Sequence, residues 1–151
     1  MIELSIFNST DYKNTEKLED LAVFLFTHLG KYGDPLHQIK SCIDYAFSPA
    51  EGKGGLVVLC KDEGELVGAS VVNHTGMGGY IPSEQLVYIA VHENNRGQGL
   101  GKKILRYTLD HCQGDMALHV EYDNPATYLY KSLGFVNKYA EMRRPGDQNH
   151  G

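Results

Sequence analysis

The sequence predicts a mixed α/β fold in which one sheet carries helices on both faces. Two observations lead to this prediction. An early pair of apolar runs separated by a short turn is typical of a β-hairpin, which favours antiparallel pairing. Later strand-like runs alternate with amphipathic helical segments, which favours parallel pairing. The predicted order is β-α-α-β-β-β-α-β-α-β, and we expect residues 1–151 to form a single domain.

The first part of the chain is predicted to be a strand followed by two helices. Residues 2–7 alternate apolar and polar side chains, as a strand does. Asn14 is placed to cap the first helix and Gly30 to end it. Asp34, followed by Pro35, is placed to cap the second helix with its carboxylate. The two helices have apolar stripes formed by Leu18, Leu21, Ala22, Leu25 and Leu29, and by Leu36, Ile39, Ile43 and Phe47.

The middle of the chain is predicted to be a hairpin and a buried strand. Residues 56–60 and 65–74 are the hairpin strands, and residues 62–64 form the turn. A glycine-rich loop follows. Residues 85–91 are almost entirely apolar, which is typical of a strand covered on both faces.

The last part of the chain is predicted to contain two helices and two strands. Apolar residues recur at helical spacing over residues 100–112 and again over residues 125–133. Residues 116–122 and 135–143 are predicted strands. The polar residues after Pro145 are expected to form a loose tail, residues 145–151.

The composition narrows the classes of function. The formal net charge of −5 argues against nucleic acid as the main partner. No apolar run is long enough to span a membrane, and the N-terminus lacks the pattern of a signal peptide. The three cysteines, Cys42, Cys60 and Cys112, show no paired spacing. We therefore expect free thiols and a cytoplasmic protein.

Three glycines on alternate positions lie between the buried strand and the helix that begins near Leu100, as in a phosphate-binding loop. A P-loop is excluded because Arg96 stands at its first glycine and Lys103 at its hydroxyl position. A dinucleotide fingerprint is excluded because Lys102 replaces its third glycine and five residues separate the strand from Gly97. A plain glycine-rich connector is the simpler alternative, although a connector has no need of three glycines.

The hexapeptide from Arg96 to Gly101, RGQGLG, matches the pattern Arg/Gln-x-x-Gly-x-Gly/Ala at every defined position. By this motif the chain resembles the GNAT superfamily of acetyl-CoA-dependent N-acetyltransferases. In that family the loop wraps the pyrophosphate of coenzyme A. Backbone N–H groups of the loop and the dipole of the following helix stabilise this negatively charged group. The resemblance implies a cofactor loop made of Arg96, Gly97, Gln98, Gly99, Leu100, Gly101 and Lys102.

A second motif supports the resemblance. Family members commonly carry an Asn followed by Ala-x-x-Leu-Tyr-x-x-x-Gly-Phe, and the second part matches without a gap. Asp123 occupies the slot expected for the asparagine and Asn124 stands beside it, so either could contact the pantetheine arm. The matching residues are Ala126, Leu129, Tyr130, Gly134 and Phe135.

The resemblance implies a GNAT fold, with a mixed, mostly antiparallel sheet of six to seven strands and about four helices. It also implies that the strand at 85–91 splays from the next strand, so that Ile89, Ala90 and Val91 hold the pantetheine arm. Acetyl-CoA would be the co-substrate, without a metal. Tyr130 would protonate the leaving thiolate, although its ring also fits a core position. Glu84 is the candidate base, with a solvated strand end as the alternative.

Weaker candidates for the base are His74, Tyr88, His119 and Glu121.

The sequence does not identify the amine that accepts the acetyl group. The resemblance implies a small-molecule or peptide amine as acceptor, no nucleic acid or membrane partner, and a homodimer as one oligomeric option. The alternatives to an N-acetyltransferase are a non-catalytic acyl-CoA-binding module of the same fold and an ordinary nucleotide-binding protein.

Overall fold

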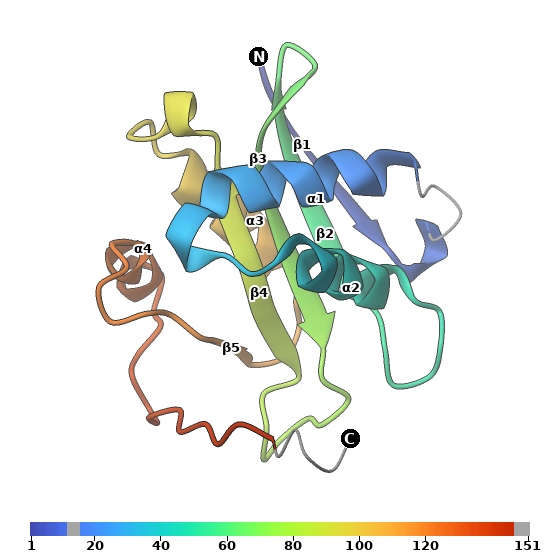
Figure 1. The fold of residues 1–151 in the computed structure, drawn as a ribbon, viewed down its shortest axis with the longest axis vertical. Helices are drawn as coiled ribbons and strands as arrows, with labels where there is room; N and C mark the ends of the chain where they lie inside the picture. Colours follow the sequence, from blue (N-terminus) through green and yellow to red (C-terminus); the bar gives the residue numbers. More distant parts are fainter. Residues whose placement is uncertain (12–15, 147–151) are drawn as a thin grey trace.

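A computed structural model describes residues 1–11 and 16–146 (Figure 1). Its sheet has five strands in the order β1-β2-β3-β4-β5. All neighbouring pairs are antiparallel except β4–β5, which is parallel. The mixed sheet is therefore confirmed. The strands are β1 (Ile2–Asn8), β2 (Gly55–Asp62), β3 (Glu65–His74), β4 (Glu84–Val91) and β5 (Met116–Leu118).

Four α-helices flank the sheet among the described residues. They are α1 (Glu16–Leu29), α2 (Leu36–Phe47), α3 (Leu100–Asp110) and α4 (Ala126–Ser132). Helices α1 and α2 cover one face and α3 covers the other, and α4 lies to the left of β4 in this view (Figure 1). The order β-α-α-β-β-β-α-β-α agrees with the prediction up to α4.

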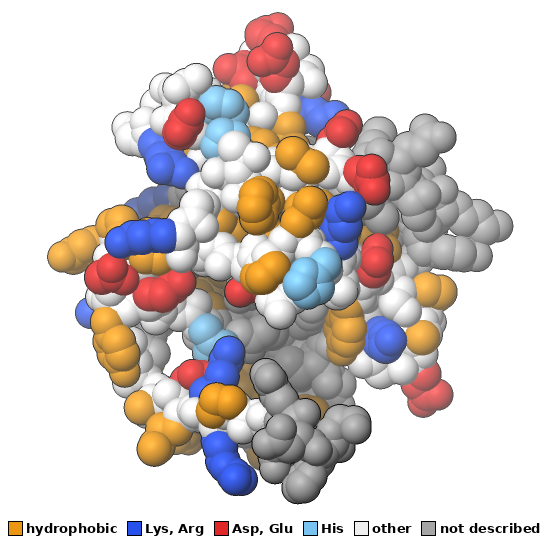
Figure 2. Space-filling model, in the orientation of Figure 1, with side chains coloured by type: hydrophobic (Ala, Val, Ile, Leu, Met, Phe, Trp, Pro, Cys, Tyr) orange, Lys and Arg blue, Asp and Glu red, His pale blue; other side chains and the backbone are white. Residues whose placement is uncertain are grey.

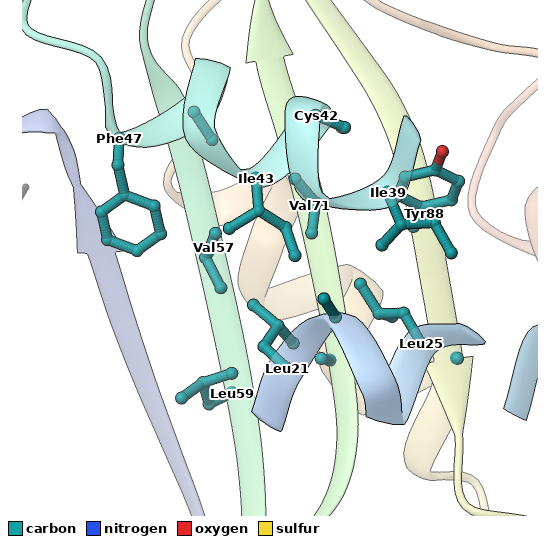
Figure 3. Packing of buried hydrophobic residues seen from close by; sticks show 14 residues of the cluster. Leu21, Leu25, Ile39, Cys42, Ile43, Phe47, Val57, Leu59, Val71 and Tyr88 are labelled. Atoms are coloured by element: carbon teal, nitrogen blue, oxygen red, sulfur yellow. The ribbon is translucent and has the colours of Figure 1, made fainter. Parts of the chain in front are cut away.

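The sheet separates two apolar cores. On the α1/α2 face, Leu25 and Ile39 pack against sheet residues that include Val71 and Tyr88 (Figure 3). On the α3 face, Ile104 packs in a cluster that also contains Tyr130 of α4. Exposed apolar side chains gather over α1 (Figure 2), where Val23 and Phe26 are about half exposed.

Several local predictions are confirmed. Helix α1 ends at Leu29, and Gly30 follows with a φ of +57°. The β2–β3 hairpin turns through Glu63 and Gly64, both with positive φ. Glu63 adopts this conformation without being Gly, Asn or Asp, because the two-residue turn requires it.

The predicted strand at 135–143 is wrong, and the sheet therefore has fewer than six strands. The structure shows no strand there, and Val136, Tyr139 and Met142 are each at least 80% exposed. A strand needs a partner edge, and β5 spans only three residues instead of the predicted seven at 116–122. The segment therefore has too short an edge on which to pair.

Some predicted features lie outside the described residues, and one predicted cap is wrong. The cap at Asn14, the side chain of Leu18 and tail residues 147–151 lie outside the described part of the chain. The capping role predicted for Asp34 is wrong: Pro35 occupies the cap position of α2, and no side chain caps that helix. Within residues 1–11 and 16–146, no helix is long and apolar enough to cross a membrane. Over the same residues, no three His, Cys, Asp or Glu side chains form a group that could hold a metal.

Candidate active site

The candidate site lies where β4 and β5 separate. The two strands pair only through Glu84–Met116, Gln85–Ala117 and Leu86–Leu118. Within the described residues, β4 has no partner on this side from residue 87 to residue 91. The strand therefore has an open edge over its second half, and we refer to this space as the opening.

The backbone of β4 presents two residues to the opening. The N–H of His92 donates to the carbonyl of Val67 at 2.8 Å, so these two residues form a hydrogen-bonded antiparallel pair. Such pairs alternate with non-bonded pairs along the ladder. Counting back, Ala90 bonds to β3, whereas Ile89 and Val91 direct their N–H and C=O groups toward the opening. The predicted contact of the cofactor with Ile89 and Val91 is geometrically available, but the polar backbone of Ala90 faces β3.

A β-bulge in β4 changes which residues share a face. Tyr88 lies opposite Val71 and Leu86 opposite Val72, so Val87 is the extra residue. As a result, Leu86 packs in the α3 core while Tyr88 packs in the α1/α2 core.

Glu84 lies on the side of Leu86, at the paired end of β4. Its side chain is buried, and its Oε2 is 2.7 Å from Nδ1 of His74. Burial and then the charge of Glu84 raise the pKa of the Cys112 thiol to about 12. Glu84 is thus placed away from the open edge at 87–91. The neighbouring Gln85 projects to the opposite, α1/α2 face, because side chains alternate along a strand.

The loop before α3 exposes backbone donors. Gly97 and Gly99 have φ angles of +78° and +79°, and neither has a non-neighbouring atom within 4 Å of the position of a Cβ. No side chain caps α3, so the N–H groups at its start have no intrahelical partner. Gln98 is exposed, Lys102 is partly buried, and Leu100 is buried in the α3 core. These donors and the open space fit a pyrophosphate group.

The side chain of Arg96 is exposed but hydrogen-bonds to two backbone carbonyls of the protein. Its Nη2 donates to the carbonyl of His28 at 2.6 Å and its Nε donates to the carbonyl of Val91 at 3.2 Å. Arg96 therefore joins the end of α1 to the end of β4. In this arrangement the loop offers an anion its backbone, and the guanidinium group holds the loop in place.

Tyr130 is buried in the cluster that also contains Ile89 and Val91. Its ring lies edge-on to Phe135, with 5.9 Å between centroids. Burial, followed by the charge of Glu121, raises the pKa of the hydroxyl to about 12. The core role and a proton-donating role are therefore compatible, because the phenol stays protonated at neutral pH.

Asp123 and Asn124 both have partners within the protein. The Oδ2 of Asp123 is 3.2 Å from Nζ of Lys31, and its carbonyl accepts a hydrogen bond from the hydroxyl of Tyr32. The Oδ1 of Asn124 accepts from the N–H of Ala126 at 2.9 Å, which satisfies a donor at the start of α4. Asn124 thus supports the helix, and Asp123 ties the β5–α4 connection to the residues after α1.

One contact at the site joins residues far apart in the chain and was not predicted from the sequence. The hydroxyl of Tyr88 donates to Oδ2 of Asp34 at 2.6 Å. The two residues are 54 positions apart, and no local pattern links them. Their proximity follows only from the packing of α2 on the sheet. His119 and Glu121, the weaker candidates on the predicted β5 face, lie beyond the end of the observed strand.

The comparisons with known proteins agree with this geometry. A family model described as an acetyltransferase (GNAT) domain matches residues 53–137, more than half of the chain. No curated protein sequence matches the chain.

Solved structures share the fold over most of the chain. The ribosomal-protein-alanine N-acetyltransferase of Brucella melitensis biovar Abortus 2308 is 12% identical, with a TM-score of 0.67 over 97% of this chain and 99% of that one. Aminoglycoside N-acetyltransferase AAC(6')-Iy, in complex with CoA, is 16% identical, with a TM-score of 0.64 over 97% and 95%. The NatC complex bound to Gag peptide and CoA contains a chain 18% identical, with a TM-score of 0.67 over 89% and 84%. These identities show the fold, and the family model shows the membership: the chain belongs to the GNAT family of acetyltransferases.

Proposed function

We propose that the protein transfers the acetyl group of acetyl-CoA to a primary amine, which belongs to a small molecule or a peptide. The observation that carries this proposal is the opening beside β4, edged by the backbone groups of Ile89 and by the N–H of Val91, whose carbonyl accepts a hydrogen bond from Arg96. One end of that edge leads into the glycine loop, and the buried Tyr130 packs in the same cluster. Similar structures include enzymes named for protein and aminoglycoside substrates, which supports an amine acceptor of either kind.

The loop at 96–101 would hold the pyrophosphate, and the open edge of β4 would hold the pantetheine arm as an added strand does. Backbone N–H groups of Ile89 and Val91 point to this side, so one of them can hydrogen-bond the thioester carbonyl. Such a donor stabilises the oxyanion that develops when the amine attacks.

Tyr130 would give its proton to the leaving thiolate. A thiolate of ordinary basicity has a pKa of about 8.5. Because burial raises the pKa of Tyr130 to about 12, the residue carries its proton at neutral pH. General acid catalysis of this kind contributes about 100-fold or more to the rate.

A proton must also leave the acceptor ammonium, whose pKa is about 10. Glu84 is the candidate proposed from the sequence. Its hydrogen bond with His74 and its place at the paired end of β4 mean that it would have to act through water.

The test compares two tyrosines of α4. Tyr130→Phe should lower kcat for amine-dependent release of CoA by about 100-fold while leaving CoA binding unchanged. Tyr128→Phe is the matched control, since Tyr128 is 81% exposed on the same helix and should behave as the wild type. Equal activity of the two variants would remove Tyr130 from the chemistry.

The alternative is a module that binds acyl-CoA without turnover. If the wild type binds CoA but releases no thiol with any amine in a panel of alkylamines, amino acids, aminoglycosides and peptide N-termini, the catalytic proposal fails and the binding module stands.

We also propose that residues 1–151 act as one catalytic domain, because similar structures match 97% of the chain.

A further inference from the structure

The connection between α1 and α2, residues 30–35, runs from the end of α1 in front of β4, on the α1/α2 face of the sheet, to the start of α2 (Figure 1). At one end, Lys31 and Tyr32 contact Asp123, in the connection after β5. At the other end, Asp34 contacts Tyr88 of β4. The α1–α2 connection therefore reaches from one side of the opening to the other, and it brings the Asp34 carboxylate to β4 at the bulge.

The Asp34 carboxylate is held by a hydrogen bond but has no cationic partner among the described residues. It does not cap α2, and its Oδ2 accepts a hydrogen bond from the hydroxyl of Tyr88. Burial first, and Asp34 second, raise the pKa of Tyr88, so the phenol remains a donor. Within the described residues, no Lys, Arg or His side chain forms an ion pair with Asp34, and the residue is exposed. Its other oxygen is free to accept a hydrogen bond from a ligand.

The position of Tyr88 places this carboxylate near the proposed thioester. Tyr88 precedes Ile89, whose backbone faces the opening, and its ring lies beside Ile39 in the first turn of α2 (Figure 3). The Asp34 carboxylate therefore lies one tyrosine side chain away from the backbone of β4, on the α1/α2 face, next to the first residue whose backbone faces the opening. Glu84, by contrast, lies at the paired end of the strand.

We propose that Asp34, oriented by Tyr88, binds the ammonium group of the acceptor. The enzyme would then select amines that are cationic at neutral pH, such as alkylamines, over uncharged arylamines. This inference rests on the proposed function, and it assigns to Asp34 the contact with the amine that Glu84 would make only through water.

The proton balance is complete with these groups. The bound ammonium has three N–H bonds, and the amide product keeps one. One proton passes to Asp34 and from there to water, because the carboxylate is exposed. The freed amine attacks the thioester carbon, the C–N bond forms, and the C–S bond breaks. The second proton leaves the nitrogen for solvent, and the thiolate takes its proton from Tyr130, which regains one from solvent.

The experiment uses benzylamine and aniline, which carry the same ring but differ in charge at neutral pH, with saturating acetyl-CoA and thiol release as the readout. The wild type should acetylate benzylamine with the higher kcat/KM. Asp34→Asn should raise the KM for benzylamine about 10-fold or more, since a hydrogen bond between two charged groups is lost, and leave the KM for aniline unchanged. Asp44→Asn is the matched control, an exposed aspartate on α2 that should change neither value.

Four results would overturn the proposal. These are equal KM changes for the two amines, no change for Asp34→Asn, or a wild type that uses aniline as readily as benzylamine or turns over neither. Glu84→Gln is a further variant to test. If it lowers kcat for benzylamine while Asp34→Asn changes no kinetic constant, Glu84 and not Asp34 takes the proton of the ammonium, and the proposal fails. An unchanged CoA dissociation constant in Asp34→Asn separates this proposal from cofactor binding. The proposed function fails separately, when no amine of the wider panel releases CoA.

Discussion

In the glycine loop, the same substitution at two nearby glycines is expected to change the stability of the protein in opposite directions. Gly99→Ala and Gly101→Ala each add one methyl group. Gly99 has a φ of +79° and precedes α3, whereas Gly101 lies inside the first turn of the helix. We expect the first variant to be less stable than the wild type and the second to be slightly more stable.

The magnitudes follow from the geometry. At Gly99 no non-neighbouring atom lies within 4 Å of the added methyl, so the cost is the left-handed backbone alone, roughly 1–2 kcal/mol. At Gly101 the methyl would meet Leu129 Cδ2 at 3.4 Å and Val91 Cγ2 at 3.8 Å, which are ordinary contacts. Replacing a helical Gly by Ala gains up to about 1 kcal/mol, and we expect about half of that in the first turn.

Urea denaturation measures both values by linear extrapolation, and CoA titration measures the effect on the loop. Gly99→Ala should also weaken CoA binding, because strain in the loop would turn its backbone N–H groups away from the position of the pyrophosphate. Gly101→Ala should bind CoA about as tightly as the wild type, since the motif accepts Ala at this position. A change of stability with the same sign in both variants would refute this account of the loop.

Three further predictions concern stability. Ser70 and Thr108 are fully buried and share a hydrogen bond of 2.7 Å. Thr108→Val should therefore lower the free energy of unfolding by about 1–3 kcal/mol, because it leaves the Ser70 hydroxyl unpaired, and the double variant with Ser70→Ala should recover part of this loss. Additive losses of the two single variants in urea denaturation would contradict the pairing. Asn73 has a buried Oδ1 without a partner among the described residues, so Asn73→Val should raise the free energy of unfolding by about 1 kcal/mol, and a lower urea midpoint would disprove the account. The pKa of His28 is lowered, first by burial and then by His92, so the folded state binds fewer protons and its stability should fall as the pH drops below about 6.5. In His28→Phe the urea midpoint should depend less on pH between 7.5 and 5, and an unchanged pH dependence would assign the effect to another group.

The sequence predicted those parts of the fold that depend on neighbouring residues. Gly30 ends α1, residues 62–64 turn the hairpin, and α4 forms over the second motif, because each depends on local backbone preference or periodicity. The glycine loop was found in the same way. Its spacing is local, and its helix begins where the motif places it, at Leu100.

The remaining features depend on contacts between distant segments. Asp34 has the sequence of a helix cap, yet the nearby hydroxyl of Tyr88 offers it a partner that only the packed structure provides. The bulge at Val87 arises from the register between β3 and β4, which periodicity within one strand does not reveal. Residues 135–143 have the composition of a strand but lack an edge of sufficient length, so composition alone predicted one strand too many.

The α1–α2 connection also bears on the rate of turnover. Its contacts with the β5–α4 connection are an exposed hydrogen bond from Tyr32 to the Asp123 carbonyl and the ion pair of Lys31 with Asp123, whose side chains are 69% and 68% exposed. Exposed pairs of this kind contribute at most about 1 kcal/mol. Releasing that end therefore costs far less than the barrier of about 16 kcal/mol that corresponds to a turnover of about ten per second. Acceptors should enter and products leave much faster than the acetyl group is transferred, and thiol release should show no initial burst.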